Sequence, residues 1–246
     1  MPATKTVEVT KCDDVPKESV DGLPTLVYWG ICGLAQPCRY AMELSGVDYV
    51  DVRIDAGVHE TPEYKTVWTK AKADVGTVVP FVNLPYCLDG DTKFSQSNAI
   101  LRYAGSLLKG GENLLRGDAT RLNVALEQAT DFDNSVTRPC YGDVTVLVAK
   151  LNDGAMDPVY AQWSNFLGNH AFLAGPDVTI ADCKFYEVLR KVSVIAKEFK
   201  AKDPLDNCPA LKAYVDRFES LPKIKAYQAS PAFHARPLNN PQASFK

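Results

Sequence analysis

The order of short strands and helices in the first 107 residues most constrains the fold of this chain. TLVYW at 25–29 is β-branched and aromatic, which is typical of a strand. QPCRYAMELSG at 36–46 has proline in its first turn and glycine at its end, which is typical of a helix. VDYVDVRI at 47–54 alternates and predicts a second strand. Because the connections are short, these elements predict a βαβ unit with parallel strands.

A second group of elements follows in residues 81–107. This stretch predicts a strand, a turn at Asp89–Gly90, another strand and a helix that begins near Ser97. A short helix at 64–72 is expected between the two groups. The order βαβ then ββα is the thioredoxin-like topology, with an α/β sheet of about four strands. Residues 1–23 are polar and predict a mobile extension ahead of it.

Beyond residue 118 the pattern is helical almost throughout. Thr179 and Asp182 have the spacing of a capping box. Apolar residues then recur at intervals of three and four, which predicts a helix with one buried face: Ala181, Phe185, Val188, Val192, Ile195 and Phe199. The predicted domains are an extension at 1–23, an α/β domain at 24–108, a linker at 109–118 and an all-α helical bundle at 119–246.

Composition excludes several classes of function. The net charge is −3 with both signs interspersed, so neither nucleic acid nor an anionic membrane is an expected partner. The lysines at 191–202 are interpreted as a solvated helix face. Seven cysteines without C-x-x-C spacing favour a reducing, cytoplasmic location. Three isolated histidines predict no metal site.

Five stretches carry a resemblance to a known family: LVYWGICGLAQPCRYAMEL (26–44), W-x-x-x-K (68–72), NLPYCLDG-x-x-K-x-x-QSNAIL (83–101), FLAGPDVTIAD (172–182) and SPAFHARP (230–237). In this order the chain resembles cytosolic glutathione S-transferases, and the mu class most closely. The resemblance implies a homodimer that conjugates glutathione, its co-substrate, to hydrophobic electrophiles in detoxification, with no further cofactor. A glutathione-dependent isomerase or peroxidase of sigma type and a non-catalytic ligand-binding relative remain alternatives.

Tyr28 lies at the end of the first predicted strand, and the resemblance implies that it is the catalytic residue. A thiol with a pKa of about 8.5 is mostly protonated at neutral pH, and only the thiolate is a good nucleophile. Lowering that pKa by about two units requires roughly 2.7 kcal/mol. A hydrogen bond to a charged group contributes about 1.5–3 kcal/mol, so one hydroxyl donor can supply much of the shift.

The resemblance also implies which residues contact glutathione. A cis bond before Pro85 would free the backbone of Leu84 to pair with the cysteinyl unit. The start of the helix at Ser97 suits the γ-glutamyl carboxylate. Lys65 stands where the family has an arginine, and it keeps the charge without the bidentate geometry. The full implied set is Tyr28, Trp29, Leu34, Lys65, Trp68, Lys72, Asn83, Leu84, Pro85, Gln96 and Ser97, with Asp131 reaching the glutathione of the neighbouring subunit.

The second substrate and the dimer are assigned in the same way. Tyr141 matches a second tyrosine that can donate a hydrogen bond to a developing oxyanion. The implied electrophile pocket contains Leu34, Thr137, Tyr141, Phe233 and Ala235. Phe81 matches an aromatic key that inserts between helices of the partner, and Arg102 matches a residue near the dimer axis.

Two other nucleophile mechanisms compete with the tyrosine. Related classes use a serine just before Q-P-C-R, but Ala35 has no hydroxyl and closes that route. Cys32 and Cys38 leave a cysteine-based thiol transferase open, although their spacing does not form a redox dithiol. Gly30 and Cys32 also replace a usual acid and base of the mu pattern.

Overall fold

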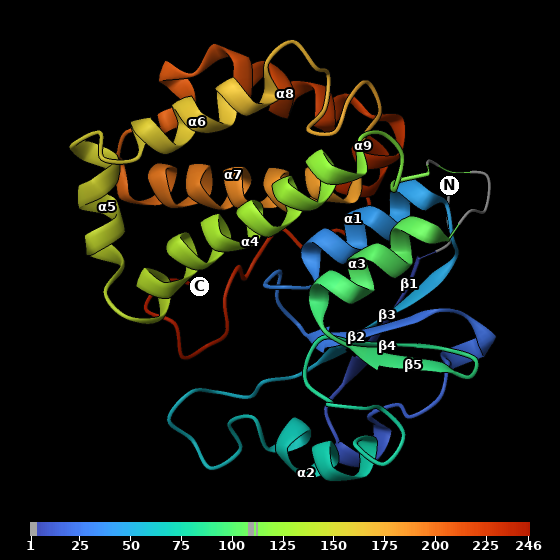
Figure 1. The fold of residues 1–246 in the computed structure, drawn as a ribbon. Helices are drawn as coiled ribbons and strands as arrows, with labels where there is room; N and C mark the ends of the chain where they lie inside the picture. Colours follow the sequence, from blue (N-terminus) through green and yellow to red (C-terminus); the bar gives the residue numbers. More distant parts are fainter. Residues whose placement is uncertain (1–3, 108–110, 112) are drawn as a thin grey trace.

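The structure is a computed structural model that describes residues 4–107, 111 and 113–246. These residues form a sheet domain and a helical domain that pack against each other (Figure 1). The predicted linker at 109–118 falls partly on residues 109, 110 and 112, which lie outside the described residues. Residues 1–3 of the predicted extension lie outside them as well.

The sheet domain follows the predicted βαβ-ββα order. Gly46 ends the first helix with a φ of 76°, and Gly90 turns the hairpin with a φ of 57°. Both are left-handed conformations that glycine adopts without steric cost. The elements are β2 (Thr25–Trp29), α1 (Gln36–Ser45), β3 (Tyr49–Ile54), α2 (Thr66–Val75), β4 (Tyr86–Asp89), β5 (Thr92–Ser95) and α3 (Ser97–Ser106).

The sheet has five strands rather than the predicted four, in the order β1-β3-β2-β4-β5. The extra strand is β1 (Thr4–Val9), which pairs in parallel with β3 from Thr4 opposite Tyr49 to Val9 opposite Ile54. The expectation of a mobile extension was therefore wrong for residues 4–9. Its strand sequence is mostly polar because it forms a sheet edge, and its pairing partner lies more than 40 residues away, so no local turn signal marks it. Two 3-10 turns follow, η1 (Cys12–Asp14) and η2 (Val20–Gly22).

The helical domain confirms the predicted pattern. Thr179 and Asp182 form the capping box, in which the Thr179 N–H donates to Asp182 Oδ2 at 2.7 Å. Of the six predicted apolar positions that follow, all but Phe199 are buried. The elements are α4 (Ala119–Tyr141), α5 (Val144–Asn152), α6 (Asp157–Leu167), α7 (Ile180–Phe199), η3 (Pro204–Asn207), α8 (Pro209–Ser220) and α9 (Pro222–Gln228).

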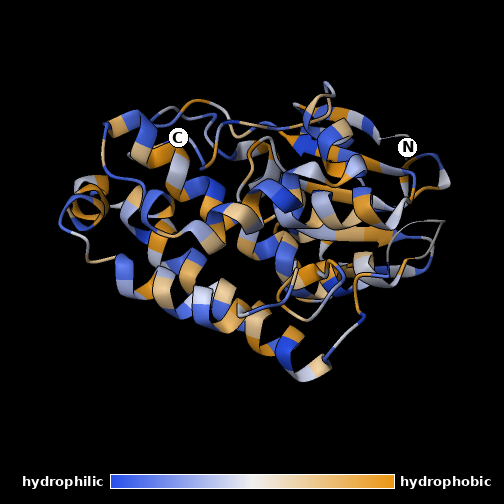
Figure 2. Ribbon diagram, turned by 90° about the horizontal axis from the view of Figure 1, so that it is seen from above, coloured by the Kyte–Doolittle hydropathy of each residue, from blue (hydrophilic) through white to orange (hydrophobic). Residues whose placement is uncertain are grey.

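Helices α1 and α3 lie between the sheet and the helical domain, whereas α2 covers the opposite face of the sheet (Figure 1). The buried ring of Tyr40 on α1 packs edge-on against Tyr186 of α7 at 5.4 Å and against Phe218 of α8 at 5.8 Å. The helices carry apolar and polar positions in alternation along their length (Figure 2), as helices that bury one face do. No helix among the described residues is long and apolar enough to span a membrane.

The C-terminal segment after α9 ties the two domains together. The Cys32 N–H donates to the Pro237 carbonyl at 2.8 Å, and the Gly33 N–H donates to the Leu238 carbonyl at 3.0 Å. Farther along, the Ser244 N–H donates to the carbonyl of Cys140 at 2.8 Å. These bonds fix the loop between β2 and α1 relative to the end of α4, and the candidate site lies there.

Candidate active site

A cavity of about 220 Å³ lies where the end of β2 faces α4 and α7. Hydroxyl and charged side chains from both domains converge on it. Larger hollows of about 410 and 520 Å³ lie elsewhere on the molecule and include neither Tyr28 nor Tyr141. The cavity is lined by Tyr28, Gly33, Leu34, Asp133, Asn134, Thr137, Tyr141, Lys191 and Asn239.

Tyr28 presents a hydroxyl to this cavity from the end of β2, and the residue is 6% exposed. Its oxygen accepts a hydrogen bond from the Leu34 N–H at 3.2 Å. The hydroxyl proton has no acceptor among the described residues. Burial raises the pKa of Tyr28, although the bond from Leu34 opposes this shift, so the group is neutral at physiological pH. Tyr28 is therefore a hydrogen-bond donor with a free proton.

Gly33 controls the space around that hydroxyl, and the sequence alone did not single it out. Its φ is +40°, and a Cβ placed on it would lie 2.6 Å from Tyr28 Oη. Any larger residue would collide with the tyrosine. The only signal in the sequence is a glycine in the loop that follows the predicted strand.

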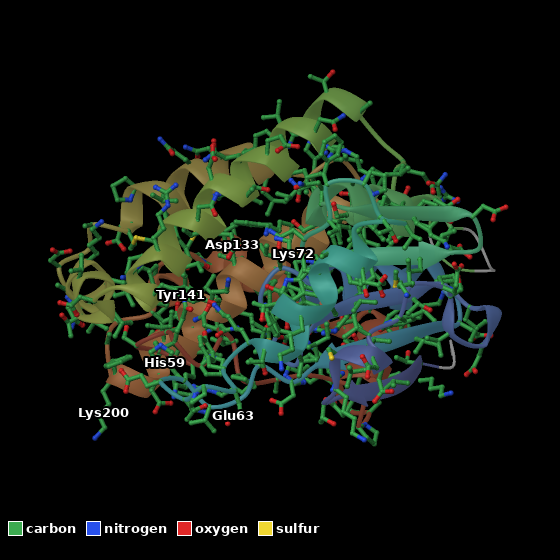
Figure 3. The ribbon with its side chains drawn as sticks, turned by 90° about the horizontal axis from the view of Figure 1, so that it is seen from below. His59, Glu63, Lys72, Asp133, Tyr141 and Lys200 are labelled. Carbon is green, nitrogen blue, oxygen red and sulfur yellow. The ribbon has the colours of Figure 1, made fainter. Side chains whose placement is uncertain are left out.

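Tyr141 presents a second hydroxyl from the last turn of α4. Its oxygen accepts a hydrogen bond from the Asn240 N–H at 3.0 Å, an arrangement that parallels Tyr28 and Leu34. Burial raises its pKa, so it too is a neutral donor at physiological pH. Figure 3 labels Tyr141 and Asp133, which lie about two turns apart on α4.

A buried charge cluster of Asp133, Lys184 and Lys191 adjoins the two hydroxyls. Lys184 Nζ donates to Asp133 Oδ2 at 2.7 Å, and Lys191 Nζ donates to Asp133 Oδ1. Burial opposes ionisation of Asp133, yet the two ammonium groups hold its pKa well below the usual range. Interpreting Lys191 as part of a solvated face was wrong, because it is 1% exposed. Its carboxylate partner is 58 residues away in sequence, so spacing along the chain gave no hint of the pair.

The residues predicted to hold the glutathione backbone surround the start of β4. The bond between Leu84 and Pro85 is cis, as the resemblance implied. The backbone of Leu84 makes no hydrogen bond to any described residue, which leaves it free for a ligand. Gln96 is exposed at the start of α3 with a φ of 80°, and Ser97 is half-buried beside it. Asn83 is exposed next to Leu84.

The predicted glycyl contacts lie on α2 and at its start. Trp68 is buried and stacks on Tyr86 at 5.9 Å, whereas Lys72 is exposed (labelled in Figure 3). Lys65 has a φ of 59°, and its Nζ donates to Gln242 Oε1 of the C-terminal segment at 2.7 Å.

The structure does not bring every predicted residue to the cavity. Leu34, Thr137 and Tyr141 line it, but Phe233 and Ala235 lie behind the β2–α1 loop. There the Phe233 ring packs edge-on against Tyr227 at 5.4 Å, and the Ala235 carbonyl accepts from Arg190.

Trp29, which was predicted to contact glutathione, also lies away from the cavity, whereas Asp131, Phe81 and Arg102 were predicted to act at the partner subunit rather than in the cavity. Trp29 is buried in the core without lining it. Asp131 and Phe81 are exposed on the surface, and Arg102 donates to Glu127 at 2.8 Å.

The cysteine alternative is disfavoured. The buried Cys32 thiol donates to the His234 carbonyl at 2.9 Å, and burial raises its pKa to about 11. Burial likewise raises the pKa of Cys38 to about 12. Both sulfurs are therefore protonated at neutral pH and are poor nucleophiles. In the part of the chain that the structure describes, no three His, Cys, Asp or Glu side chains form a metal-binding group.

Two family models match the two domains of this chain. The model of the glutathione S-transferase N-terminal domain matches residues 24–106. The model of the glutathione S-transferase C-terminal domain matches residues 130–231. The chain belongs to the glutathione S-transferase family. Individual members of the family are similar to it over most of their length.

A glutathione S-transferase of Dermatophagoides pteronyssinus is 36% identical over 214 residues, which cover 83% of this chain and 89% of the relative. Human glutathione S-transferase Mu 3 is 34% identical over 231 residues, which cover 92% of this chain and 97% of the relative. The crystal structure of the glutathione S-transferase Blo t 8 has the same fold, with a TM-score of 0.73 at 23% identity. The match covers 90% of this chain and 99% of the Blo t 8 chain.

Proposed function

We propose that this chain conjugates the sulfur of glutathione to small hydrophobic electrophiles, with Tyr28 as the residue that stabilises the thiolate. The observation that carries the proposal is the Tyr28 hydroxyl, which accepts from the Leu34 N–H and keeps its own proton free at the cavity. A bound sulfur anion would be its acceptor. One hydrogen bond to an anion contributes about 1.5–3 kcal/mol, which lowers a thiol pKa by roughly one to two units.

The start of α1 reinforces the effect of Tyr28. The helix begins at Gln36, directly after the loop that holds Leu34. The positive end of the helix dipole therefore lies close to the position of the sulfur and favours the anion further.

The rest of glutathione fits the free polar groups around the sulfur. The unpaired backbone of Leu84 can pair with the cysteinyl unit, and the N–H groups at the start of α3 suit the γ-glutamyl carboxylate. Trp68 and Lys72 supply donors for the glycyl carboxylate. Lys65 can bind the same carboxylate when its ammonium releases the side-chain oxygen of Gln242.

The chemical step needs an acceptor held against the thiolate. The sulfur provides the electron pair of the new C–S bond, and the leaving group departs with the pair of the broken bond. When the acceptor is an unsaturated carbonyl, the charge moves to the carbonyl oxygen instead. The Tyr141 hydroxyl, which is fixed by the Asn240 N–H, is placed to donate a hydrogen bond to that charge.

A homodimer completes the proposal. The Phe81 side chain is 92% exposed, and the Ser95 hydroxyl fixes its backbone by donating to the Phe81 carbonyl at 3.1 Å. A hollow of about 190 Å³ lies between α4 and α6 and is large enough for one phenyl ring. We infer that Phe81 of each subunit enters this hollow of the other, with Arg102 near the axis and Asp131 close to the second glutathione. The hollow is lined by Val124, Ala125, Gln128, Val159, Gln162, Trp163 and Phe166.

Location and co-substrate follow from the same proposal. All seven cysteines are free, which suits a reducing compartment such as the cytoplasm. Glutathione is the expected co-substrate, and the proposed chemistry requires no metal.

The test is the conjugation of glutathione to 1-chloro-2,4-dinitrobenzene by the wild type and by the Tyr28→Phe protein. The variant should lose roughly 10- to 100-fold in kcat/KM, because it lacks the hydrogen bond to the anion. Tyr103→Phe is a matched control, since its hydroxyl donates to Asp89 away from the cavity. Full conjugation rate in Tyr28→Phe would overturn the proposal. A peroxide and an isomerisation substrate measured in parallel distinguish the sigma-type activities.

A further inference from the structure

We propose that the electrophile cavity selects acceptors that carry a carboxylate or a similar anionic oxygen group, and that the Lys191 ammonium binds this group. The inference rests on the proposed conjugation function. It concerns which electrophile is conjugated rather than how the sulfur is activated.

Lys191 reaches the cavity from α7, and its side chain is 2% exposed. An ammonium group has three donors. One binds Asp133 Oδ1 and a second binds Thr137 Oγ1 at 3.0 Å. No described residue accepts from the third. A substrate oxygen in the cavity, whose lining also includes Tyr28 and Tyr141, would supply the missing acceptor.

The charges around Lys191 do not balance without a ligand. Asp133 faces two ammonium groups, since its other oxygen accepts from Lys184 at 2.7 Å. Glu187, one turn before Lys191, is a second acid close to the ammonium, and both of its oxygens accept from Arg190 at 2.8 Å. The cluster therefore keeps one uncompensated positive charge in a buried place. Such a charge is costly unless an anion compensates it.

The anion in question differs from those of glutathione. The two carboxylates of glutathione are assigned to α3 and α2, and its sulfur is assigned to Tyr28. The cavity volume of about 220 Å³ is that of one substituted ring, because an apolar cavity of about 150 Å³ already holds benzene. A single-ring acceptor with an acidic substituent matches both the size and the charge.

Two chloronitroarenes of nearly equal shape test the inference, namely 4-chloro-3-nitrobenzoate and 4-chloro-3-nitrobenzamide. In both reactions the thiolate forms a C–S bond at the carbon that bears chlorine, the C–Cl bond breaks, and chloride leaves with its electron pair. Each enzymatic kcat/KM is divided by the rate with glutathione alone, which removes the difference in intrinsic reactivity. The wild type should prefer the benzoate by about 10-fold or more.

Two lysine variants provide a matched pair. Lys191→Met removes the ammonium that lines the cavity, and Lys184→Met removes the one that does not. Each variant leaves Asp133 paired with one lysine, so neither creates an unpaired buried carboxylate. Lys191→Met should lose the preference for the benzoate, whereas Lys184→Met should keep it. A measurement that needs no variant is inhibition of 1-chloro-2,4-dinitrobenzene turnover, in which benzoate should compete at least several-fold better than benzamide.

Three outcomes overturn the inference. Equal losses on both substrates in Lys191→Met would mean that the ammonium acts on the thiolate. Loss of the preference in Lys184→Met as well would mean that the cluster is structural. No preference for benzoate in the wild type, with normal turnover of 1-chloro-2,4-dinitrobenzene, would overturn the inference alone. If the wild type conjugates none of the three arenes, the proposed conjugation function fails, and this inference fails with it.

Discussion

Replacing Gly33 with alanine would move the Tyr28 hydroxyl without changing its chemistry. The new Cβ would lie 2.6 Å from Tyr28 Oη and 2.8 Å from Cε1, where ordinary contact begins near 3.4 Å. The ring must therefore retreat by roughly 0.8 Å, and a misplacement of about 1 Å at a reacting centre costs on the order of 100-fold in rate. Alanine at a φ of +40° adds about 1–2 kcal/mol of strain to the folded state.

The assay is conjugation of glutathione to 1-chloro-2,4-dinitrobenzene, run beside a thermal unfolding scan. Gly33→Ala should lose about 10- to 100-fold in kcat/KM and a few degrees in Tm. Gly30→Ala is the control in the same loop, because its Cβ would meet nothing nearer than 3.9 Å. Because the new Cβ would make only ordinary van der Waals contacts, this variant should stay within about two-fold of the wild type.

Two results would refute this reasoning. Wild-type activity in Gly33→Ala would show that the position of the Tyr28 ring does not limit catalysis. An equal loss in Gly30→Ala would show that the loop tolerates no side chain for reasons unrelated to Tyr28.

Three further changes test other parts of the structure. Asp133→Asn leaves two buried lysines without a carboxylate and should destabilise the fold by about 3–5 kcal/mol in a urea titration; a loss below about 1 kcal/mol would contradict the cluster. Burial, aided by Arg39 and Arg53, lowers the pKa of His234 to about 4, so the unfolded chain binds more protons than the folded one between pH 6.5 and 4. Stability should thus fall by roughly 1 kcal/mol as the pH drops through that window, after the part-exposure of the ring is discounted, and His234→Gln should remove this slope. Phe81→Ser should shift the dimer toward monomer in sedimentation or light scattering, and an unchanged dimer would exclude the proposed key.

Local patterns in the sequence predicted most of the fold. The proline near the start of α1, Gly46 at its end and the capping box at Thr179 all mark boundaries through short-range chemistry, and each was confirmed. Strand β1 was missed because its pairing with β3 depends on a distant partner and because an edge strand carries polar residues. A contact between residues far apart in the sequence cannot be predicted in this way when neither residue lies in a recognisable local motif.

The candidate site shows the same division between local and distant contacts. Tyr28 could be predicted as a donor from its place at a strand end and from the surrounding motifs. The residues that complete its environment could not be predicted in this way. Asp133 and Lys191 are 58 residues apart in the sequence, and the Gly33 N–H donates to a carbonyl of the distant C-terminal segment. Phe233 and Ala235 were assigned to the pocket by resemblance, yet they pack behind the β2–α1 loop instead.

Ultraviolet difference titration of the bound glutathione sulfur tests the central claim most directly, because it reports ionisation without any electrophile. In the wild-type complex the thiol should titrate one to two pH units below its value of about 8.5, and in the Tyr28→Phe complex it should return toward that value. Identical titration curves for the two complexes would contradict the account.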